Sequence, residues 1–570
     1  MKKVNAIILF SVFTVSICFL VSCNSESSSE NDSISTDSVT IAKGEESFLK
    51  NCSSCHNFKY DGIGPQLGGV TSENSVDWVK SFISDPKKMI DAGDKRALDR
   101  LKRFKAIMPS FAHLPEDEIH SIIAFLHTQK KRKRQDVPED TNDIRNPIPD
   151  TIQMSNLSLN LELFTQLPAT SDQPPLTRII KLDYEPNSGD LYISDIRGKL
   201  YKLVDGKPIL CFDIAALKPQ LLTHPGINTG FGSFAFHPEF TKNGLLYTTH
   251  AEAAFSGKAD FYYPDSIPVT LQWILTEWTT DPKTLPFNGK GRELFRIDMP
   301  TQVHGVQEIA FNKGAKPGDD DYGLLYVGIG DGGSALIGQP LVSSTPGKLW
   351  GSIIRIDPFG RNSFNGKYGI PPNNPFSKED RTQYAGEIYA YGFGNPHRIN
   401  WTKSGYLVAA NIGEHHIESL NIILPGRFYG WPIREGKFEE RFYNQHGRIY
   451  PLPADDSTYR IVYPAAQYDH DEGIAIAGGY EYTGKSVPQL QGKYLFGDLN
   501  SGRLFFVAMQ DLKPGKEATI KEWSIKVNGV QTTLAKLCNN PRVEMRFGKD
   551  KSGEMYIFTK SDGKVYRLVK

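Results

Sequence analysis

The segment Cys52-Ser53-Ser54-Cys55-His56 constrains this chain more than any other part of its sequence. Two thiols separated by two residues can each form a thioether with a vinyl group of haem, and the histidine that follows then reaches the iron. A CxxC pair alone also suits a redox disulfide or half of a zinc site, but the adjacent histidine and the lack of a second CxxC argue against both. We therefore predict a covalent c-type haem, with Cys52 and Cys55 as thioether residues and His56 as an iron ligand.

Met108 is the candidate for the second axial ligand. A haem that only transfers electrons needs its sixth position filled, and a methionine thioether does so while raising the reduction potential. Met108 directly precedes a predicted helix, which is indicated by Pro115, an acidic first turn and apolar residues at helical spacing. Met89 is the alternative ligand, and an ordinary core methionine is the alternative role for Met108.

Residues 43–129 resemble a small class I cytochrome c. Besides the CxxCH segment, the resemblance rests on Gly44-Glu45-Glu46 opening a first helix, the turn Gly62-Ile63-Gly64-Pro65 and the Met108-Pro109 step. It implies an all-α electron-transfer domain, which we place at residues 41–130.

The first 22 residues have the pattern of a secretory signal, with Lys2 and Lys3 before an apolar run. Leu20-Val21-Ser22-Cys23 resembles a bacterial lipobox, which implies cleavage before Cys23 and lipidation of that cysteine. An uncleaved membrane anchor is the alternative, although the apolar run is short for a span. We expect a lipoprotein of the cell envelope, facing the periplasm or the outer surface and held to the membrane by its lipid alone.

Residues 23–40 are too polar to bury a core, which predicts a flexible tether. The chain has 65 Lys and Arg against 65 Asp and Glu, so it lacks the excess of positive charge that is typical of nucleic-acid-binding proteins. Cys211 and Cys538 are left without a haem or lipid role. Export permits a disulfide between them, and two separate buried thiols are the alternative.

The chain beyond a charged, Pro-rich linker at 131–160 is rich in short strands with turn signals. A unit of glycine followed within three residues by tyrosine recurs as Gly189-Asp190-Leu191-Tyr192, Gly244-Leu245-Leu246-Tyr247, Gly323-Leu324-Leu325-Tyr326, Gly386-Glu387-Ile388-Tyr389 and Gly553-Glu554-Met555-Tyr556. Recurrent four-stranded units with variable loops indicate a β-propeller at 161–570, because radial repetition protects sheet edges.

Residues 165–570 look like the glucose/sorbosone dehydrogenase family, whose members oxidise sugars with pyrroloquinoline quinone and calcium. The matches include Phe234-Ala235-Phe236-His237-Pro238, Tyr326-Val327-Gly328-Ile329-Gly330-Asp331-Gly332-Gly333, Ile370-Pro371-Pro372-Asn373-Asn374-Pro375-Phe376 and Phe428-Tyr429-Gly430-Trp431-Pro432. The resemblance implies six blades. The expected fold class is therefore multidomain, a small all-α cytochrome c domain joined to an all-β six-bladed propeller.

The same resemblance implies a catalytic histidine that removes a hydroxyl proton as hydride passes to the quinone. Its position falls on His304, and Asp331 matches the partner aspartate of the family. A neutral imidazole suits this role near neutral pH, and a nearby carboxylate would orient it. The alternatives are a hydrogen-bonded loop histidine and a turn aspartate.

Some positions depart from the family pattern. Val306 and Gln307 replace a Gly-Gly pair after the base, which narrows the approach of a ligand to the backbone. Gly394 stands where an arginine usually precedes the Asn-Pro of the quinone-contacting loop. Asn395 fits the quinone contact of the family, while Arg398 is either a substitute for the missing arginine or an ordinary surface residue.

The family's calcium loop corresponds to Glu414–Asn421, which is shortened, and we assign no calcium ligand there. Calcium prefers oxygen ligands, and backbone carbonyls leave no trace in a sequence. The adjacent His415 and His416 suggest either a transition-metal site or a solvated polar loop.

The leading hypothesis is an exported quinohaemoprotein that oxidises a sugar or related alcohol at the propeller and passes electrons to its own haem and on to a downstream acceptor. A short linker raises the local haem concentration to roughly millimolar, which favours a redox role for the propeller. The alternatives are a non-catalytic propeller that binds a glycan or protein beside an electron-transfer cytochrome, and a propeller hydrolase, for which the sequence shows no calcium-centred carboxylate and Asn cluster.

Overall fold

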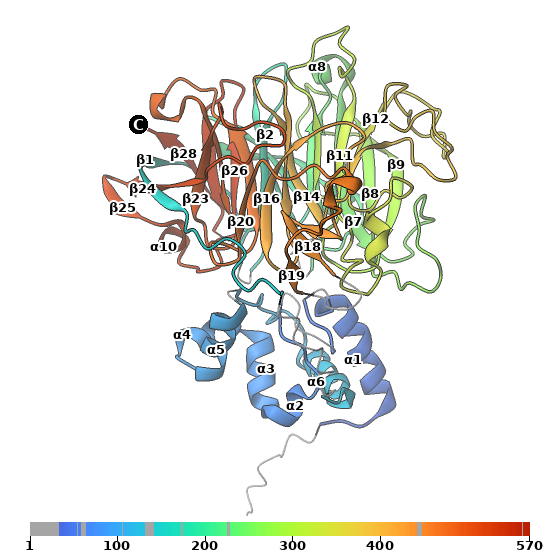
Figure 1. Cartoon of the computed structure of the whole chain (residues 1–570), viewed down its shortest axis with the longest axis vertical. Coiled ribbons are helices and arrows are strands. Elements are labelled where there is room, and N and C mark those ends of the chain that lie inside the picture. The colour runs from blue at the N-terminus through green and yellow to red at the C-terminus, as the bar shows by residue number, and fades with distance from the viewer. Residues whose placement is uncertain are drawn as a thin grey trace, which may run out of the picture.

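The computed structural model describes residues 34–53, 55–58, 64–104, 106–131, 142–172, 175–224, 229–441, 447–560 and 562–570. The predicted signal segment and Cys23 lie outside these residues. Figure 1 shows a small helical domain that lies against one face of a larger β domain. Among the described residues, no helix is long and apolar enough to cross a membrane.

The N-terminal domain is all-α, as predicted. Its helices are α1 (Ser38–Asn51), α2 (Val70–Glu73), α3 (Val76–Ser84), α4 (Pro86–Asp91), α5 (Lys95–Phe104) and α6 (Glu116–Thr128). The helix α6 follows Pro115, has three acidic residues in its first turn and buries an apolar face that includes Ile119, Ile122 and Ile123. This is the helix predicted beyond Met108.

The helix α1 begins earlier than the sequence suggested. Asp37 caps it by accepting a 2.8 Å hydrogen bond from the backbone N–H of Thr40, so the helix starts at Ser38, inside the segment predicted as a tether. Gly44 therefore lies within the helix instead of opening it. A Cβ at Gly44 would come within 1.8 Å of the Ser121 carbonyl oxygen, so only glycine allows α1 and α6 to pack this closely.

The β domain is a six-bladed propeller of four-stranded antiparallel sheets, as predicted. The first blade consists of β2 (Ile179–Tyr184), β3 (Leu191–Asp195), β4 (Lys199–Val204) and β5 (Lys207–Asp213), and the second of β6 (Phe231–Phe236), β7 (Leu245–Ala253), β8 (Leu271–Thr279) and β9 (Lys290–Met299). The third blade consists of β10 (Glu308–Phe311), β11 (Leu325–Ile329), β12 (Ser352–Ile356) and β13 (Ile388–Tyr391), and the fourth of β14 (Asn395–Trp401), β15 (Leu407–Ile412), β16 (Ile417–Ile423) and β20 (Ala466–Asp469). The fifth blade consists of β21 (Ile476–Glu481), β22 (Lys493–Asp498), β23 (Leu504–Ala508) and β24 (Lys521–Val527), and the sixth of β26 (Met545–Lys549), β27 (Met555–Thr559), β28 (Lys564–Val569) and β1 (Gln153–Gln166).

The ring closes by pairing the two ends of the domain. Strand β1 is antiparallel to β28 and completes the sixth blade, and it is also parallel to β24 of the fifth. The first strands of successive blades contact each other around the whole ring, including β26 with β2. Closure leaves few exposed sheet edges, which accounts for the stability of this architecture. Because β1 begins at Gln153, it occupies part of the segment predicted as a linker.

Two kinds of loop open on one face of the propeller: those joining an outer strand to the next inner strand, such as β9–β10 and β20–β21, and those joining second and third strands, such as β11–β12 and β15–β16. We call this the covered face, because the helical domain lies on it. Figure 1 shows α10 (Leu534–Cys538), β18 (Phe438–Glu440) and β19 (Ile449–Tyr450) on this side, and α8 (Phe240–Asn243) on the opposite side.

The two remaining cysteines do not pair. Cys211 is buried in β5, where its Sγ lies 3.2 Å from the carbonyl oxygen of Leu200, and Cys538 is half-buried at the end of α10. Burial raises the pKa of Cys538 to about 11, so it is an unreactive thiol near neutral pH.

Candidate functional site

An apolar cavity of about 750 Å³ lies within the helical domain. Cys52, Cys55, His56 and Met108 line it, as do the apolar side chains of Phe48, Leu67, Val70, Trp78, Phe82 and Phe111. Burial raises the pKa of the Cys52 thiol to about 12, so the free thiol is protonated near neutral pH.

The imidazole of His56 is held in one orientation. Its Nδ1 lies 2.8 Å from the carbonyl oxygen of Pro65, so Nδ1 carries the proton and Nε2 is the nitrogen available to a metal. Burial lowers the pKa of His56, which keeps the ring neutral as ligation requires. A Cβ at Gly64 would lie only 2.4 Å from Cε1 of His56, so the Gly64-Pro65 turn fits against the ring only with glycine at this position.

The two candidate methionines lie in different places. Met108 lines the same cavity as Cys52, Cys55 and His56, beside Pro109. Met89 packs instead against the cluster formed by Trp78, Val79, Ile119 and Ile123. The arrangement therefore suits Met108 to the sixth position of a haem iron.

A second constellation lies on the covered face of the propeller, where His304 and Asp331 meet. Nδ1 of His304 lies 2.8 Å from Oδ1 of Asp331, which also accepts a 2.8 Å hydrogen bond from the N–H of Gly333. Both side chains are almost fully buried. His304 comes from the loop between β9 and β10 and Asp331 from the loop after β11, so two loops at the same end of the third blade bring the residues together.

The backbone around His304 is tightly constrained. His304 has a φ of 54°, which is uncommon for a residue other than glycine. A Cβ at Gly330 would come within 2.2 Å of the His304 carbonyl oxygen, which also accepts a hydrogen bond from the N–H of Gly332. Residues held in such conformations concentrate at functional sites.

Carboxylates determine the charge of His304. Burial alone would lower its pKa, but the charges of Asp331, Glu414 and Glu418 outweigh burial and raise the pKa above its usual value. Oε2 of Glu414 lies 4.0 Å from Nδ1 of His304. Burial and the charges of Asp331 and Glu435 raise the pKa of Glu414 above its usual value.

The positions that depart from the family pattern do not block this site. Val306 is buried and packs in the hydrophobic core together with Trp273. Gln307 is also buried. The carbonyl of Gly394 accepts a 2.8 Å hydrogen bond from the N–H of Asp331, which brings the start of β14, and with it Asn395, beside the dyad.

Arg398 is neither a surface residue nor directed at the dyad. It is 2% exposed, and its Nη1 donates a 2.7 Å hydrogen bond to Oε2 of Glu308, which also pairs with Lys181. A β-bulge between His397 and Ile399 directs the guanidinium toward β10. Arg398 therefore belongs to an ion network that joins the inner strands of three blades.

Four basic residues meet at the inner end of blades one and six on the covered face. We call them the cation cluster: Arg178, Arg542, Arg546 and Lys560. Glu544 is their common carboxylate, 2.9 Å from Nε of Arg542 and 3.7 Å from Nζ of Lys560. Although burial raises it, the charges of Lys560, Arg542 and Arg178 hold the pKa of Glu544 far below its usual value. One carboxylate among four basic groups leaves an excess of buried positive charge.

Several buried polar atoms near the axis have no hydrogen-bond partner among the described residues. They are Nε of Arg546, both ring nitrogens of His397, both amide atoms of Gln302 and both carboxylate oxygens of Glu414. Unpaired buried polar atoms are rare in native proteins and indicate a missing ligand or water. No local sequence pattern marks the cation cluster, because its members come from the first and last blades.

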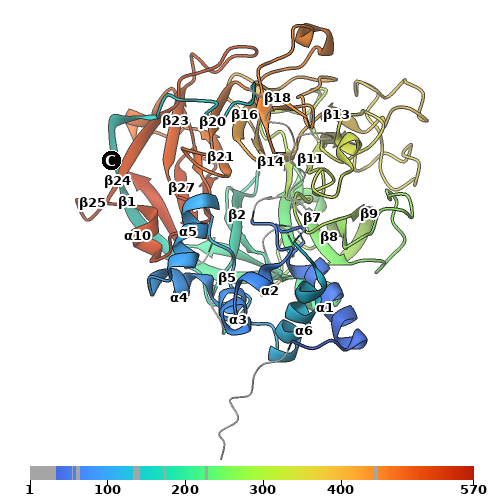
Figure 2. The same cartoon turned by 60° about the horizontal axis from the view of Figure 1, so that its bottom comes forward.

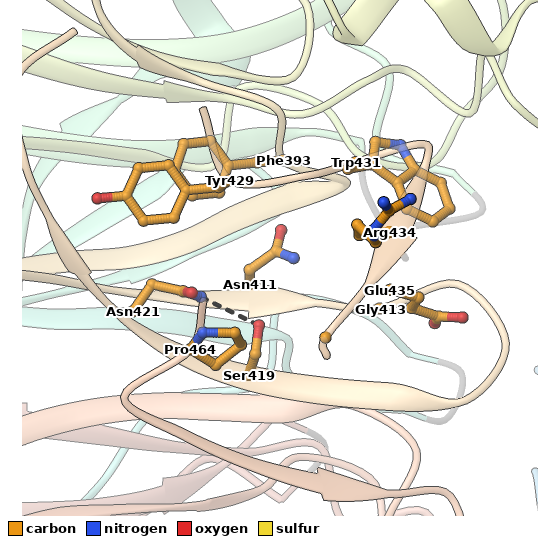
Figure 3. Close-up of a pocket in the computed structure, with 11 residues that line it drawn as sticks. Phe393, Asn411, Gly413, Ser419, Asn421, Tyr429, Trp431, Arg434, Glu435 and Pro464 are labelled. Carbon is orange, nitrogen blue, oxygen red and sulfur yellow. Dashed lines mark hydrogen bonds between the residues drawn. The ribbon is translucent and has the colours of Figure 1, made fainter. Parts of the chain in front are cut away.

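A small polar cavity lies behind the dyad. It is lined by Asn411, Ser419, Asn421 and Glu435, with Trp431 at its edge. Figure 3 shows the rings of Tyr429 and Phe393 on one side and Trp431 on the other, with Asn411 between and below them and, further below, Asn421 donating to Ser419. Trp431 was part of a matched motif, but the sequence did not reveal its contact with Asp331.

Among the described residues, the segment Glu414–Asn421 contributes to no cluster of His, Cys, Asp or Glu side chains that could hold a metal ion. Its second half is strand β16, and Oε1 of Glu435 binds the backbone N–H groups of residues 414–417. The described residues contain no group of three or more His, Cys, Asp or Glu that could hold a metal ion. His415 and His416 are both half-buried, which differs from the solvated loop that was one of the two expectations. Nε2 of His416 lies 3.0 Å from the Gly447 carbonyl oxygen.

Comparison with protein families identifies both domains. The model of the family described as Glucose / Sorbosone dehydrogenase matches residues 185–567, and that described as Cytochrome c matches residues 41–130. A cytochrome c domain implies haem c, in agreement with the cavity around Cys52, Cys55 and His56.

Individual relatives are distant. The HIPL1 protein of Arabidopsis thaliana is 25% identical over 395 residues, 60% of this chain and 54% of that protein. Quinoprotein glucose dehydrogenase B of Acinetobacter calcoaceticus is 22% identical over 339 residues, 55% of this chain and 64% of that protein. The chain thus spans about half to two thirds of these relatives.

The fold has known counterparts. The crystal structure of the soluble aldose sugar dehydrogenase of Escherichia coli in its apo-form matches with a TM-score of 0.50 and 18% identity, over 72% of this chain and 99% of that one. At this identity the likeness is one of fold, and it supports the six-bladed propeller.

Proposed function

Because this chain belongs to the glucose/sorbosone dehydrogenase family, we propose that it is a quinohaemoprotein dehydrogenase that oxidises a sugar or related alcohol. The observation that carries the proposal is the His304–Asp331 dyad on the propeller face that the cytochrome c domain covers. A proton acceptor for an alcohol and a haem for the electrons thereby lie on the same side of one molecule.

The residues at the axis fit a quinone that bears carboxylates, such as pyrroloquinoline quinone. Such a ligand would satisfy the excess positive charge of the cation cluster, with Arg546 and Lys560 as the groups that hold it. When bound, the quinone accepts the hydride of the alcohol carbon. For calcium the described residues offer no group of three or more His, Cys, Asp or Glu, and we derive no role for that ion.

The dyad supplies the base. Asp331 holds the proton on Nδ1 of His304, which leaves Nε2 as the atom that accepts the hydroxyl proton of the substrate. As the imidazole becomes charged, Asp331 and Glu414 stabilise it. Burial of the whole arrangement keeps water from competing with the substrate for Nε2.

Redox titration of the purified protein with its covalent haem tests the proposal. Pyrroloquinoline quinone is added with and without calcium, followed by a panel of aldoses and simple alcohols, while the haem absorption is recorded. We expect substrate-dependent haem reduction only after quinone addition. Failure of the protein to bind the quinone would contradict the proposal and favour a propeller that binds a glycan or a protein without catalysis.

The variant His304→Ala gives the residue-level test. We expect it to bind the quinone but to reduce the haem roughly 10²–10⁴-fold more slowly, the usual contribution of general base catalysis. His127→Ala is the matched control, because His127 is exposed on α6 and contacts only Thr71 among the hydrogen bonds of its ring. Equal rates of haem reduction in the two variants would show that His304 is not the catalytic base.

A further inference from the structure

The segment of residues 106–114, which we call the Met108 segment, is a fixed wall of the haem cavity. Oγ of Ser110 donates a 2.6 Å hydrogen bond to the Ser84 carbonyl at the end of α3. Phe111 is buried, and its N–H donates to the Ile83 carbonyl. The side of this segment that faces the cavity therefore has a defined position relative to the haem.

The opposite side of the Met108 segment contacts the propeller at two points. Nη1 of Arg542 donates a 2.9 Å hydrogen bond to the carbonyl oxygen of Ile107, the residue directly before Met108. The ring of His113 lies on the ring of His224, with centroids 4.4 Å apart. One contact thus comes from each end of the segment.

Both contacts lie on the propeller face that carries the dyad. Arg542 precedes β26, His224 precedes β6 and His304 precedes β10, and each belongs to a loop that joins an outer strand to the next inner strand. Loops of this kind share one face of a propeller. In the turned view of Figure 2 the helical domain lies in front of this face.

Arg542 also connects the haem side to the axis of the propeller. Its Nε lies 2.9 Å from Oε1 of Glu544, and Oε2 of Glu544 lies 3.7 Å from Nζ of Lys560. A series of polar contacts therefore runs from Lys560, through Glu544 and Arg542, to the backbone carbonyl beside Met108.

We infer that the Met108 segment is the docking element through which electrons cross from the propeller to the haem, with Arg542 and His224 as its partners. The inference rests on the proposed dehydrogenase function. Each crossing moves one electron from the reduced cofactor to the ferric iron. Two crossings, with the iron reoxidised in between by an external one-electron acceptor, balance the two electrons of the alcohol, and the two protons pass to solvent.

Docking is measured first, on the protein with its covalent haem and without quinone. Amide hydrogen exchange of residues 106–114 reports whether the segment is held. We expect faster exchange in Arg542→Gln and in His224→Ala, and no change in Arg567→Gln, a control whose guanidinium pairs with Glu162 on the outer edge of the sixth blade. Unchanged exchange in both interface variants would overturn the inference.

A double-mutant cycle isolates the ring contact. If His113 and His224 act through each other, the double variant should exchange no faster than either single variant. Additive effects would show that the two rings contribute independently and would contradict a shared contact. The oxidised haem spectrum of His113→Ala must match that of the unmodified protein, because this residue lies near Met108.

Electron transfer is measured second, with quinone and a substrate that reduces the unmodified protein. The rate of haem reduction is compared with the rate at which a small dye takes electrons directly from the propeller. We expect His224→Ala, whose residue lies outside the cation cluster, to lose at least tenfold in haem reduction with the dye rate within about twofold. Unchanged haem reduction with normal dye turnover would overturn the inference alone, whereas absence of both activities in the unmodified protein would overturn the proposed function.

Discussion

The indole Nε1 of Trp431 donates a 3.1 Å hydrogen bond to Oδ2 of Asp331, so both oxygens of this buried carboxylate are occupied. Trp431 belongs to the long segment between β16 and β20, which returns to the covered face at this point. The indole therefore fixes the carboxylate that orients His304. It is a positioning group and not a catalytic one.

Removing this hydrogen bond should weaken catalysis while preserving binding. In Trp431→Phe the ring is kept, but Oδ2 of Asp331 loses its donor, so the carboxylate can turn away from Nδ1 of His304. We expect a drop in kcat of about tenfold with KM nearly unchanged, since an unsatisfied buried acceptor costs about 1–3 kcal/mol. An equal rise in KM would instead place Trp431 in contact with substrate.

The pH dependence of the rate should follow His304. Its pKa is raised, and the base must be neutral to accept a proton, so the rate should rise with pH through a value above the ordinary 6.5. Asp331→Asn removes the nearest of the charges that raise this pKa. We expect the inflection to move to lower pH, with a rate reduced roughly 10²–10⁴-fold. An inflection unmoved by Asp331→Asn would assign the profile to another group.

Contiguous motifs were predictable from the sequence, whereas contacts made by ring closure were not. The haem residues Cys52, Cys55 and His56 are adjacent, and their chemistry follows from their spacing. Arg178 and Lys560 are separated by nearly the whole propeller and meet only because β1 closes the sixth blade. No local pattern marks either residue.

The direction of side chains was the second reason why the structure differs from what the sequence predicted. Val306 looked like an obstruction beside the base, but it packs in the core with Trp273. Arg398 looked like a surface residue, but a bulge in β14 turns it toward Glu308. In both cases a neighbouring blade, which the sequence does not place, decides where the side chain lies.

Gly64 should be essential for the haem spectrum. In Gly64→Ala the new Cβ would lie 2.4 Å from Cε1 of His56 and would displace the ring from its hydrogen bond to Pro65. We expect loss of the low-spin spectrum typical of His and Met ligation, measured by absorption of the oxidised and reduced protein. Gly93→Ala is the control, because its Cβ would meet no atom within 4 Å, and its positive φ costs only about 1–2 kcal/mol.

Cys23 should determine the location of the protein in the cell. If the segment Leu20-Val21-Ser22-Cys23 directs lipidation, Cys23→Ser should move the protein from the membrane fraction to the soluble envelope fraction with its haem content intact. Cys18→Ser serves as the control within the predicted signal. Membrane retention of Cys23→Ser would indicate an uncleaved anchor.

Lys560 should make the stability of the cofactor-free propeller depend on pH. Burial and the neighbouring arginines lower its pKa to about 7, while in the unfolded chain the value is near 10.5. Between these values the unfolded state binds more protons than the folded state. The free energy of unfolding should therefore rise with pH from about 7 to about 10, and it should decrease again as the pH is lowered through this range.

Denaturant midpoints at pH 7 and pH 9.5 measure this effect. Lys560→Met should reduce the difference between the denaturant midpoints at the two pH values. It should also stabilise the cofactor-free protein at pH 7 by a few kcal/mol, because an apolar side chain does not have to lose a proton when it is buried. Addition of a carboxylate-bearing quinone should reduce the slope in the unmodified protein, since an anion beside Lys560 favours its charged form. A slope that persists in Lys560→Met would assign the dependence to another buried group.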